Sequence, residues 1–276
     1  MYRITFLVFF FGAFQSSQGQ EHWLVPQRYF YSIREMAYIQ VKAGQKKGGL
    51  PASIPISSIT TLQHYRPDGS VTSIEKLLTE PDKDSIALPL QEAGTHMIVL
   101  QQNRSPVIIP TDSLANLYSW DPVSANGRNE QNELPPKKEM RILIKESLKT
   151  LLQVSEILTN ACVQPSKLLL DIIPQENPNT VPRPGWKEGP VTEKFRILFK
   201  GKPLAHNRVM VSYQVPGKGW QMVGLLTDKH GRIVAERHPG PYRISCVYHE
   251  PSESDPANEL VYYWGSLCFD YSQYFR

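Results

Sequence analysis

The chain of 276 residues has few cysteines and no strongly basic run. Its three cysteines, Cys162, Cys246 and Cys268, are too few and too scattered for the disulfide framework of a small secreted domain. Alternation along a strand places Cys246 and Cys268 on opposite faces of their strands. We therefore predict free thiols and no bridge between these two residues.

The charge balance is also modest. The formal net charge is +4, and it is spread along the chain. A balance of this size gives no reason to expect a nucleic-acid partner. The apolar run in the first residues is too short to span a bilayer, and no later segment is long and apolar enough to be a membrane helix.

Motifs of catalysis are missing as well. The sequence contains no G-x-S-x-G turn, no H-E-x-x-H pair, no glycine-rich phosphate loop and no cysteine–histidine set with a recognised signature. We therefore do not expect an enzyme. No two histidines have the H-x-x-x-H spacing, so any metal site must be assembled by folding.

The first 19 residues have the pattern of a cleaved secretory signal. One positive charge, Arg3, precedes a short apolar run from Phe6 to Phe14, and Ser17 and Gly19 occupy the −3 and −1 positions of a cleavage site. Removal of residues 1–19 lowers the net charge by one, to +3. We expect a periplasmic or secreted protein with no membrane span after cleavage.

The remaining chain predicts a mostly β protein of two antiparallel sandwiches with a helical insert between them. Residues 20–110 are short, turn-punctuated segments rich in β-branched and aromatic residues, with an explicit turn at Pro67-Asp68-Gly69. Residues 166–276 repeat this pattern with the size and rhythm of an immunoglobulin-like sandwich. We expect these two ranges to be the N-terminal and C-terminal domains.

Residues 111–165 form the predicted helical insert. Thr111 and Asp112 can cap a short helix through Leu117-Tyr118. The long helical signal is KKEMRILIKESLKTLLQVSEIL, residues 137–158, whose apolar residues recur at three- and four-residue spacing. Its apolar stripe is expected to pack on a sandwich, and partner binding is the alternative.

A set of short phrases resembles a known family in the same order. They are WLVP at 23–26, AGTHMIV at 93–99, LLLDIIPQENPNTV at 168–181, LFKGKPLA at 198–205, TDKHGR at 227–232, VYHEP at 247–251 and YYWGSLCFDY at 262–271. The family consists of exported bacterial proteins of a domain of unknown function, labelled as periplasmic accessory components of nickel or cobalt uptake (NikM-like). The resemblance implies an N-terminal sandwich, a helical insert and a C-terminal sandwich similar to transthyretin-like or bacterial adhesin-repeat modules. It also implies a bound Ni(II) or Co(II) ion and a membrane transporter component as partner.

Four residues are the candidate metal ligands. Cleavage after Gly19 makes His22 the third residue of the mature chain, where the terminal amine, two amide nitrogens and the imidazole form a square-planar set that suits Ni(II) or Cu(II). A terminal Gln20 that cyclises blocks this chelate. His96, His249 and Glu250 lie in phrases shared with the family. The alternatives are a histidine that leads into the first strand and hydrogen-bonded turn histidines.

These patterns lead to two functional hypotheses. The first is an exported binding or accessory protein for nickel or cobalt uptake. The second is a non-catalytic structural or adhesive module of the cell envelope, which holds a protein or glycan. Aromatic residues of the C-terminal range would serve the second hypothesis if they were exposed, and they would be core residues otherwise.

Overall fold

The structure is a computed structural model and describes residues 21–44, 49–78, 85–110, 139–180, 191–215, 217–253 and 259–271. The predicted signal segment, Gln20 and the predicted short helix through Leu117-Tyr118 lie outside these ranges. Within them the chain is built almost wholly of strands, with three short 3-10 turns at Ile56–Ser58, Glu75–Leu78 and Ala161–Val163. The described ranges contain no helix long and apolar enough to cross a membrane.

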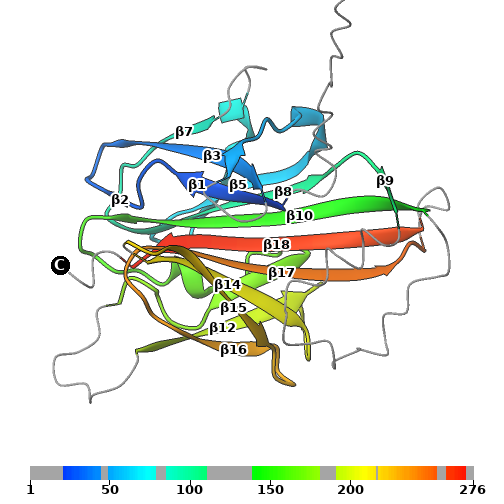
Figure 1. The fold of residues 1–276 in the computed structure, drawn as a ribbon. Helices are drawn as coiled ribbons and strands as arrows, with labels where there is room; N and C mark the ends of the chain where they lie inside the picture. Colours follow the sequence, from blue (N-terminus) through cyan, green and yellow to red (C-terminus); the bar gives the residue numbers. More distant parts are fainter. Residues whose placement is uncertain are drawn as a thin grey trace, which may run out of the picture.

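The strands form three stacked sheets. In Figure 1 the long strands β10 and β18 cross the middle of the molecule, with β1, β3 and β7 above them and β12 and β16 below. The upper sheet consists of β1 (Glu21–Pro26), β3 (Met36–Gly44), β4 (Leu50–Pro51) and β7 (Ser85–Pro89). The lower sheet consists of β11 (Leu170–Pro174), β12 (Thr192–Phe199), β13 (Lys202–Pro203) and β16 (Arg232–Glu236).

The central sheet has ten strands from both ends of the chain. Its main path is β15 (Gly219–Leu226), β14 (Arg208–Val215), β17 (Pro241–Pro251), β18 (Leu260–Asp270), β10 (Glu139–Val154), β8 (Gly94–Asn103), β5 (Ile59–Tyr65) and β6 (Val71–Ser73). The short strands β2 (Phe30–Tyr31) and β9 (Val107–Pro110) also pair with β10. One sheet therefore takes strands from both predicted sandwich ranges.

Two hydrophobic cores lie on the two faces of this sheet. The upper core joins it to the upper sheet, and the lower core joins it to the lower sheet. Strand β18 contributes to both because successive side chains point to opposite faces. Tyr262 and Trp264 enter the upper core, whereas Tyr263 and Phe269 enter the lower one. The aromatic residues of β18 are therefore core residues and do not form an exposed binding surface.

The predicted helical insert is wrong. Residues 139–154 form β10, a 16-residue strand that pairs in parallel with β18 from Ile142 to Thr150. The first half of β10 alternates buried Met140, Ile142 and Ile144 with more exposed residues, which is strand periodicity. From Leu148 onward every residue is buried, since the strand runs between two covering layers. The same apolar residues also satisfy helical spacing, so tertiary pairing decided the outcome.

The parallel pairs β10–β18 and β10–β2 are a second departure from the predicted antiparallel sandwiches. Other predictions are confirmed. The turn at Pro67-Asp68-Gly69 reverses the chain between β5 and β6, with Gly69 at a φ of 86°. All three cysteines are free and buried, and only Cys162 and Cys246 belong to the lower core.

Candidate functional site

The four predicted metal ligands lie on three different strands. His22 is in β1, His96 is in β8, and His249 and Glu250 are near the end of β17. In the part of the chain that the structure describes, no group of three or more histidine, cysteine, aspartate or glutamate side chains is close enough to hold a metal ion. Each predicted ligand has a different local partner instead.

His22 contacts a buried glutamate. Its ring atom Nδ1 lies 2.8 Å from Oε2 of Glu146, a β10 residue that is 1% exposed. The same carboxylate accepts a hydrogen bond from the Gln102 amide and lies 3.4 Å from Nη1 of Arg104. The backbone oxygen of His22 accepts hydrogen bonds from Trp264 and Ser266 of β18. These contacts tie β1 to the central sheet.

This arrangement bears on the terminal chelate. A six-membered chelate ring on His22 uses the backbone nitrogen and Nδ1 of the same residue. Nδ1 is the atom that contacts Glu146, so metal binding at the terminus requires this contact to break.

His96 belongs to a buried pair of histidines. Its Nε2 donates to the backbone oxygen of Glu92 at 2.9 Å, so its Nδ1 accepts from Nε2 of His64 at 2.8 Å. The two rings are stacked, with centroids 5.0 Å apart. Burial lowers the pKa of both side chains, to about 3 for His64, because a charged imidazole loses its hydration there. Both ring nitrogens of His96 are thus occupied by hydrogen bonds.

Glu250 and His249 occupy the outer end of β17. The Glu250 carboxylate accepts hydrogen bonds from Nζ of Lys200 at 2.5 Å and from the Tyr263 hydroxyl at 2.7 Å. These hydrogen bonds and the Lys200 charge hold its pKa below the usual value, against the opposing effect of burial. Burial lowers the pKa of His249. Glu250 therefore serves as an acceptor for two neighbouring side chains.

A second polar site, which the sequence analysis missed, begins one residue before His22. Arg243 of β17 is 7% exposed, and its guanidinium carbon lies 3.9 Å from the ring centroid of Trp23. Its Nη2 lies 3.7 Å from Oε2 of Glu21, which is beyond hydrogen-bonding distance. Within the described ranges neither Nε of Arg243 nor Oε2 of Glu21 has a hydrogen-bond partner.

Two serines extend this site across the central sheet. Ser212 of β14 is directly opposite Arg243, and Ser245 follows Arg243 on the same face of β17. Both serines are 1% exposed, and their hydroxyl oxygens have no hydrogen-bond partner among the described residues. We refer to Glu21, Trp23, Ser212, Arg243 and Ser245 together as the Arg243 site.

The electrostatics of the Arg243 site favour hydrogen-bond donors at neutral pH. Burial raises the pKa of Glu21 to about 8, with the Arg243 charge acting in the opposite direction. Glu21 is therefore mostly protonated at pH 7, so the carboxyl group 3.7 Å from Arg243 carries little negative charge there. Asp270 lies nearby on β18 and takes part in an interaction of its own.

Other buried ion pairs of the protein are much better satisfied. Lys149 of β10 lies 2.6 Å from Asp171 of β11, and Asp171 also accepts hydrogen bonds from the backbone and hydroxyl of Ser166. Arg237 contacts Glu193 and donates to a backbone oxygen. The Arg243 site is distinct because it gathers four of the six buried polar atoms that have no hydrogen-bond partner among the described residues.

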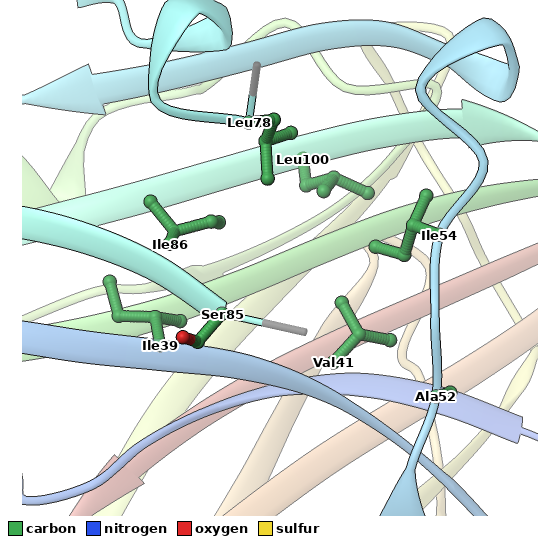
Figure 2. A pocket seen from close by; sticks show the side chains of 8 residues that line it. All are labelled: Ile39, Val41, Ala52, Ile54, Leu78, Ser85, Ile86 and Leu100. Atoms are coloured by element: carbon green, nitrogen blue, oxygen red, sulfur yellow. The ribbon is translucent and has the colours of Figure 1, made fainter. Parts of the chain in front are cut away.

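A small cavity lies elsewhere, between the upper sheet and the central sheet. It measures about 20 Å³, which is room for about one water molecule. Figure 2 shows Ile39, Val41, Ile54 and Ile86 around it, with Ser85 as the only polar side chain of the lining. A space of this size and character is a packing void and cannot hold an organic ligand.

No known family model matches the chain, and no curated protein does. Among solved structures, it is similar to trypsin-activated alpha-2-macroglobulin from Escherichia coli, with 11% identity over 91% of this chain and a TM-score of 0.22. It spans only 15% of that macroglobulin chain. It is also similar to the D0-D1 domain of intimin (10% identity, 90% and 97% of the two chains, TM-score 0.21). The chain is similar as well to the fibronectin(III)-like modules of Clostridium thermocellum CbhA, with 11% identity over 91% of this chain and 95% of that chain and a TM-score of 0.19.

TM-scores of this size carry no functional argument. The resemblance to nickel and cobalt uptake proteins therefore stays a prediction, and the function has to be argued from the residues themselves.

Proposed function

We propose that this chain is an exported, non-catalytic binding protein that holds a small molecule with a carboxylate or similar oxyanion at the Arg243 site. Export rests on the signal pattern of residues 1–19. The single observation that carries the proposal is the buried guanidinium of Arg243, whose Nε has no acceptor within the described part of the chain.

Unpaired buried polar atoms are costly. Leaving one buried donor or acceptor unsatisfied costs about 1–3 kcal/mol, and more for a charged group. Folded proteins pair most such groups, so a cluster of four calls for an explanation such as a ligand or ordered water. Four of the six such atoms in the described part of the chain gather at the Arg243 site, whereas Lys149 and Arg237 contact their carboxylate partners directly.

The chemistry of the site fits an oxyanion. A guanidinium presents paired N–H donors that match the two oxygens of a carboxylate. The ring of Trp23, 3.9 Å from the guanidinium carbon, restricts the position of the guanidinium. Ser212, Ser245 and protonated Glu21 add hydroxyl donors around it. A metal cation would meet the positive charge of Arg243.

The test is calorimetric titration of the naturally processed protein with succinate and inorganic phosphate, and with glucose as the uncharged control. Saturable binding of an oxyanion that Arg243→Met abolishes supports the proposal. Ser212→Ala and Ser245→Ala remove hydroxyls that no described residue uses, so they should fold normally and weaken binding several-fold. Ser147→Ala removes a buried hydroxyl that accepts a hydrogen bond from the Leu170 backbone, so it is the control for a general loss of stability and should bind normally. Absence of binding by every oxyanion contradicts the proposal.

Metal uptake is tested alongside it. The same protein is titrated with Ni(II), Co(II) and Cu(II), with His22→Ala as the variant and mass spectrometry of the amino terminus as the check on Gln20 cyclisation. Metal binding that His22→Ala removes and Arg243→Met leaves intact would favour the metal hypothesis over the oxyanion site.

A further inference from the structure

Strand β15 is the outermost strand of the central sheet. It pairs with β14 along all eight residues, from Gly219 to Leu226. Its other edge has no backbone hydrogen-bond partner among the described residues. Such an edge presents a row of N–H and C=O groups to which another strand can pair.

The other long edges of the described sheets carry features that discourage strand addition. Strand β16 has Arg232 and Glu236 at its ends, β11 ends at Pro174, and the edge strand β1 contains Glu21 and Pro26. Charged residues and prolines on an edge are the usual protection. Strand β15 reads GWQMVGLL and has neither.

The side chains of β15 are also unusually exposed for apolar residues. Leu226 is 67% exposed, Val223 is 44% exposed and Met222 is 40% exposed. Because neighbouring residues point to opposite faces, apolar surface is exposed on both faces of this edge.

We propose that β15 pairs with β15 of a second copy of this chain, antiparallel and with Val223 opposite its own counterpart. A two-fold axis perpendicular to the sheet puts the same face of both copies on the same side. Even-numbered residues therefore pair with even-numbered residues, and odd-numbered residues with odd-numbered ones. Centring on Val223 places Met222 opposite Gly224, and Trp220 opposite Leu226. Large side chains then lie beside small or complementary apolar ones.

The charged residues that flank β15 support this register and a second copy of the chain as the partner. With Val223 at the axis, Lys218 of one copy faces Asp228 of the other, and the pair occurs twice. Both residues are exposed and flank the uncharged strand. A register centred on Met222 loses this ionic pair and places Gly224 opposite Trp220. The same strand therefore supplies both halves of a complementary interface, which is the property of a two-fold contact.

The first test is the oligomeric state of the processed full-length chain, measured by analytical ultracentrifugation over a range of concentrations. The wild type should form a reversible dimer. Val223→Lys puts two like charges next to each other at the axis and should weaken the dimer by at least about tenfold. Val234→Lys is the matched control, since Val234 is 52% exposed on β16, and it should leave the dimer unchanged.

A second variant distinguishes loss of strand pairing from loss of folding. Val223→Cys places two thiols opposite each other, so mild oxidation should give a disulfide-linked dimer, and Val234→Cys should not. Burial raises the pKa of the native cysteines to about 12, so they compete poorly for oxidation. A wild type that is monomeric at every concentration, with no cross-link through Val223→Cys, overturns the proposal and leaves the edge to a strand from another protein.

Discussion

Replacement of Glu21 by glutamine should stabilise the protein at neutral pH and not at acidic pH. The Glu21 carboxyl is 7% exposed, and burial raises its pKa from 4.5 to about 8. A raised acid pKa means that the folded chain holds a proton that the unfolded chain releases. The contribution of Glu21 to stability therefore falls as the pH rises from about 4.5 to about 8 and is flat outside this window.

The magnitude follows from the two pKa values. Each pH unit in the window costs about 1.4 kcal/mol. The cost is roughly 1 kcal/mol at pH 5 and roughly 4 kcal/mol at pH 7.5. Glutamine has nearly the same shape and no proton to lose, so Glu21→Gln should exceed the wild type by about 3 kcal/mol more at pH 7.5 than at pH 5.

Urea unfolding of both proteins at the two pH values measures this difference. Burial also raises the pKa of Glu193 to about 7, but its contribution to the pH dependence of stability is the same in both proteins and cancels in the comparison. Glu139→Gln, at an exposed position of β10, is the control and should show no pH-dependent gain. An advantage of Glu21→Gln that is the same at both pH values would refute the assignment of a buried, protonated Glu21.

Three further predictions concern stability. Lys149→Met leaves Asp171 buried without its cation and should cost about 3–5 kcal/mol in urea unfolding, most of which a second change, Asp171→Leu, should restore. His64 resists protonation in the fold, so its own contribution to stability falls by about 1.4 kcal/mol per pH unit from pH 6.5 down to about 3, opposite in sign to the contribution of Glu21. His64→Phe removes this contribution and should move the acid-unfolding midpoint to lower pH, and an unchanged midpoint counts against the buried neutral pair. Val41→Ile adds one methylene beside the cavity and should stabilise by about 0.8 kcal/mol, whereas a loss of stability would mean that the void does not accept it.

Much of the strand content could be predicted from local pattern. Strands β17 and β18 follow the alternation in RISCVYHE and YYWGSLCFDY, which also separated Cys246 from Cys268. Local pattern works there because side chains of one strand alternate between two faces whatever the rest of the chain does. Turn residues likewise act within four positions, as at Gly69.

Strand β10 could not be predicted in this way. Its residues satisfy helical and strand spacing at once, and its lysines and glutamates suggested a solvated face. Glu146 and Lys149 are buried because partners arrive from β1, β8 and β11, which are distant in sequence. Nothing within a window of twenty residues encodes those partners.

The Arg243 site was missed for the same reason. Alternation along β17 puts Arg243 on the face opposite Ile244 and Cys246, and in a two-layer sandwich that face meets solvent. In the three-layer fold the opposite face is also covered, so Arg243 is buried next to Glu21 and Trp23. The sequence signal was an arginine and two serines at alternating positions of predicted strands, and it becomes informative only once the third layer is known.

The most direct measurement of the central claim is the ¹⁵N–¹H signal of the Arg243 side-chain Nε–H in arginine-labelled protein, assigned by its loss in Arg243→Lys. Titration with succinate should shift this signal in a saturable way and leave the Nε–H signal of Arg232 unchanged. A signal that stays fixed while succinate and phosphate are raised to millimolar concentration would contradict an oxyanion site at Arg243.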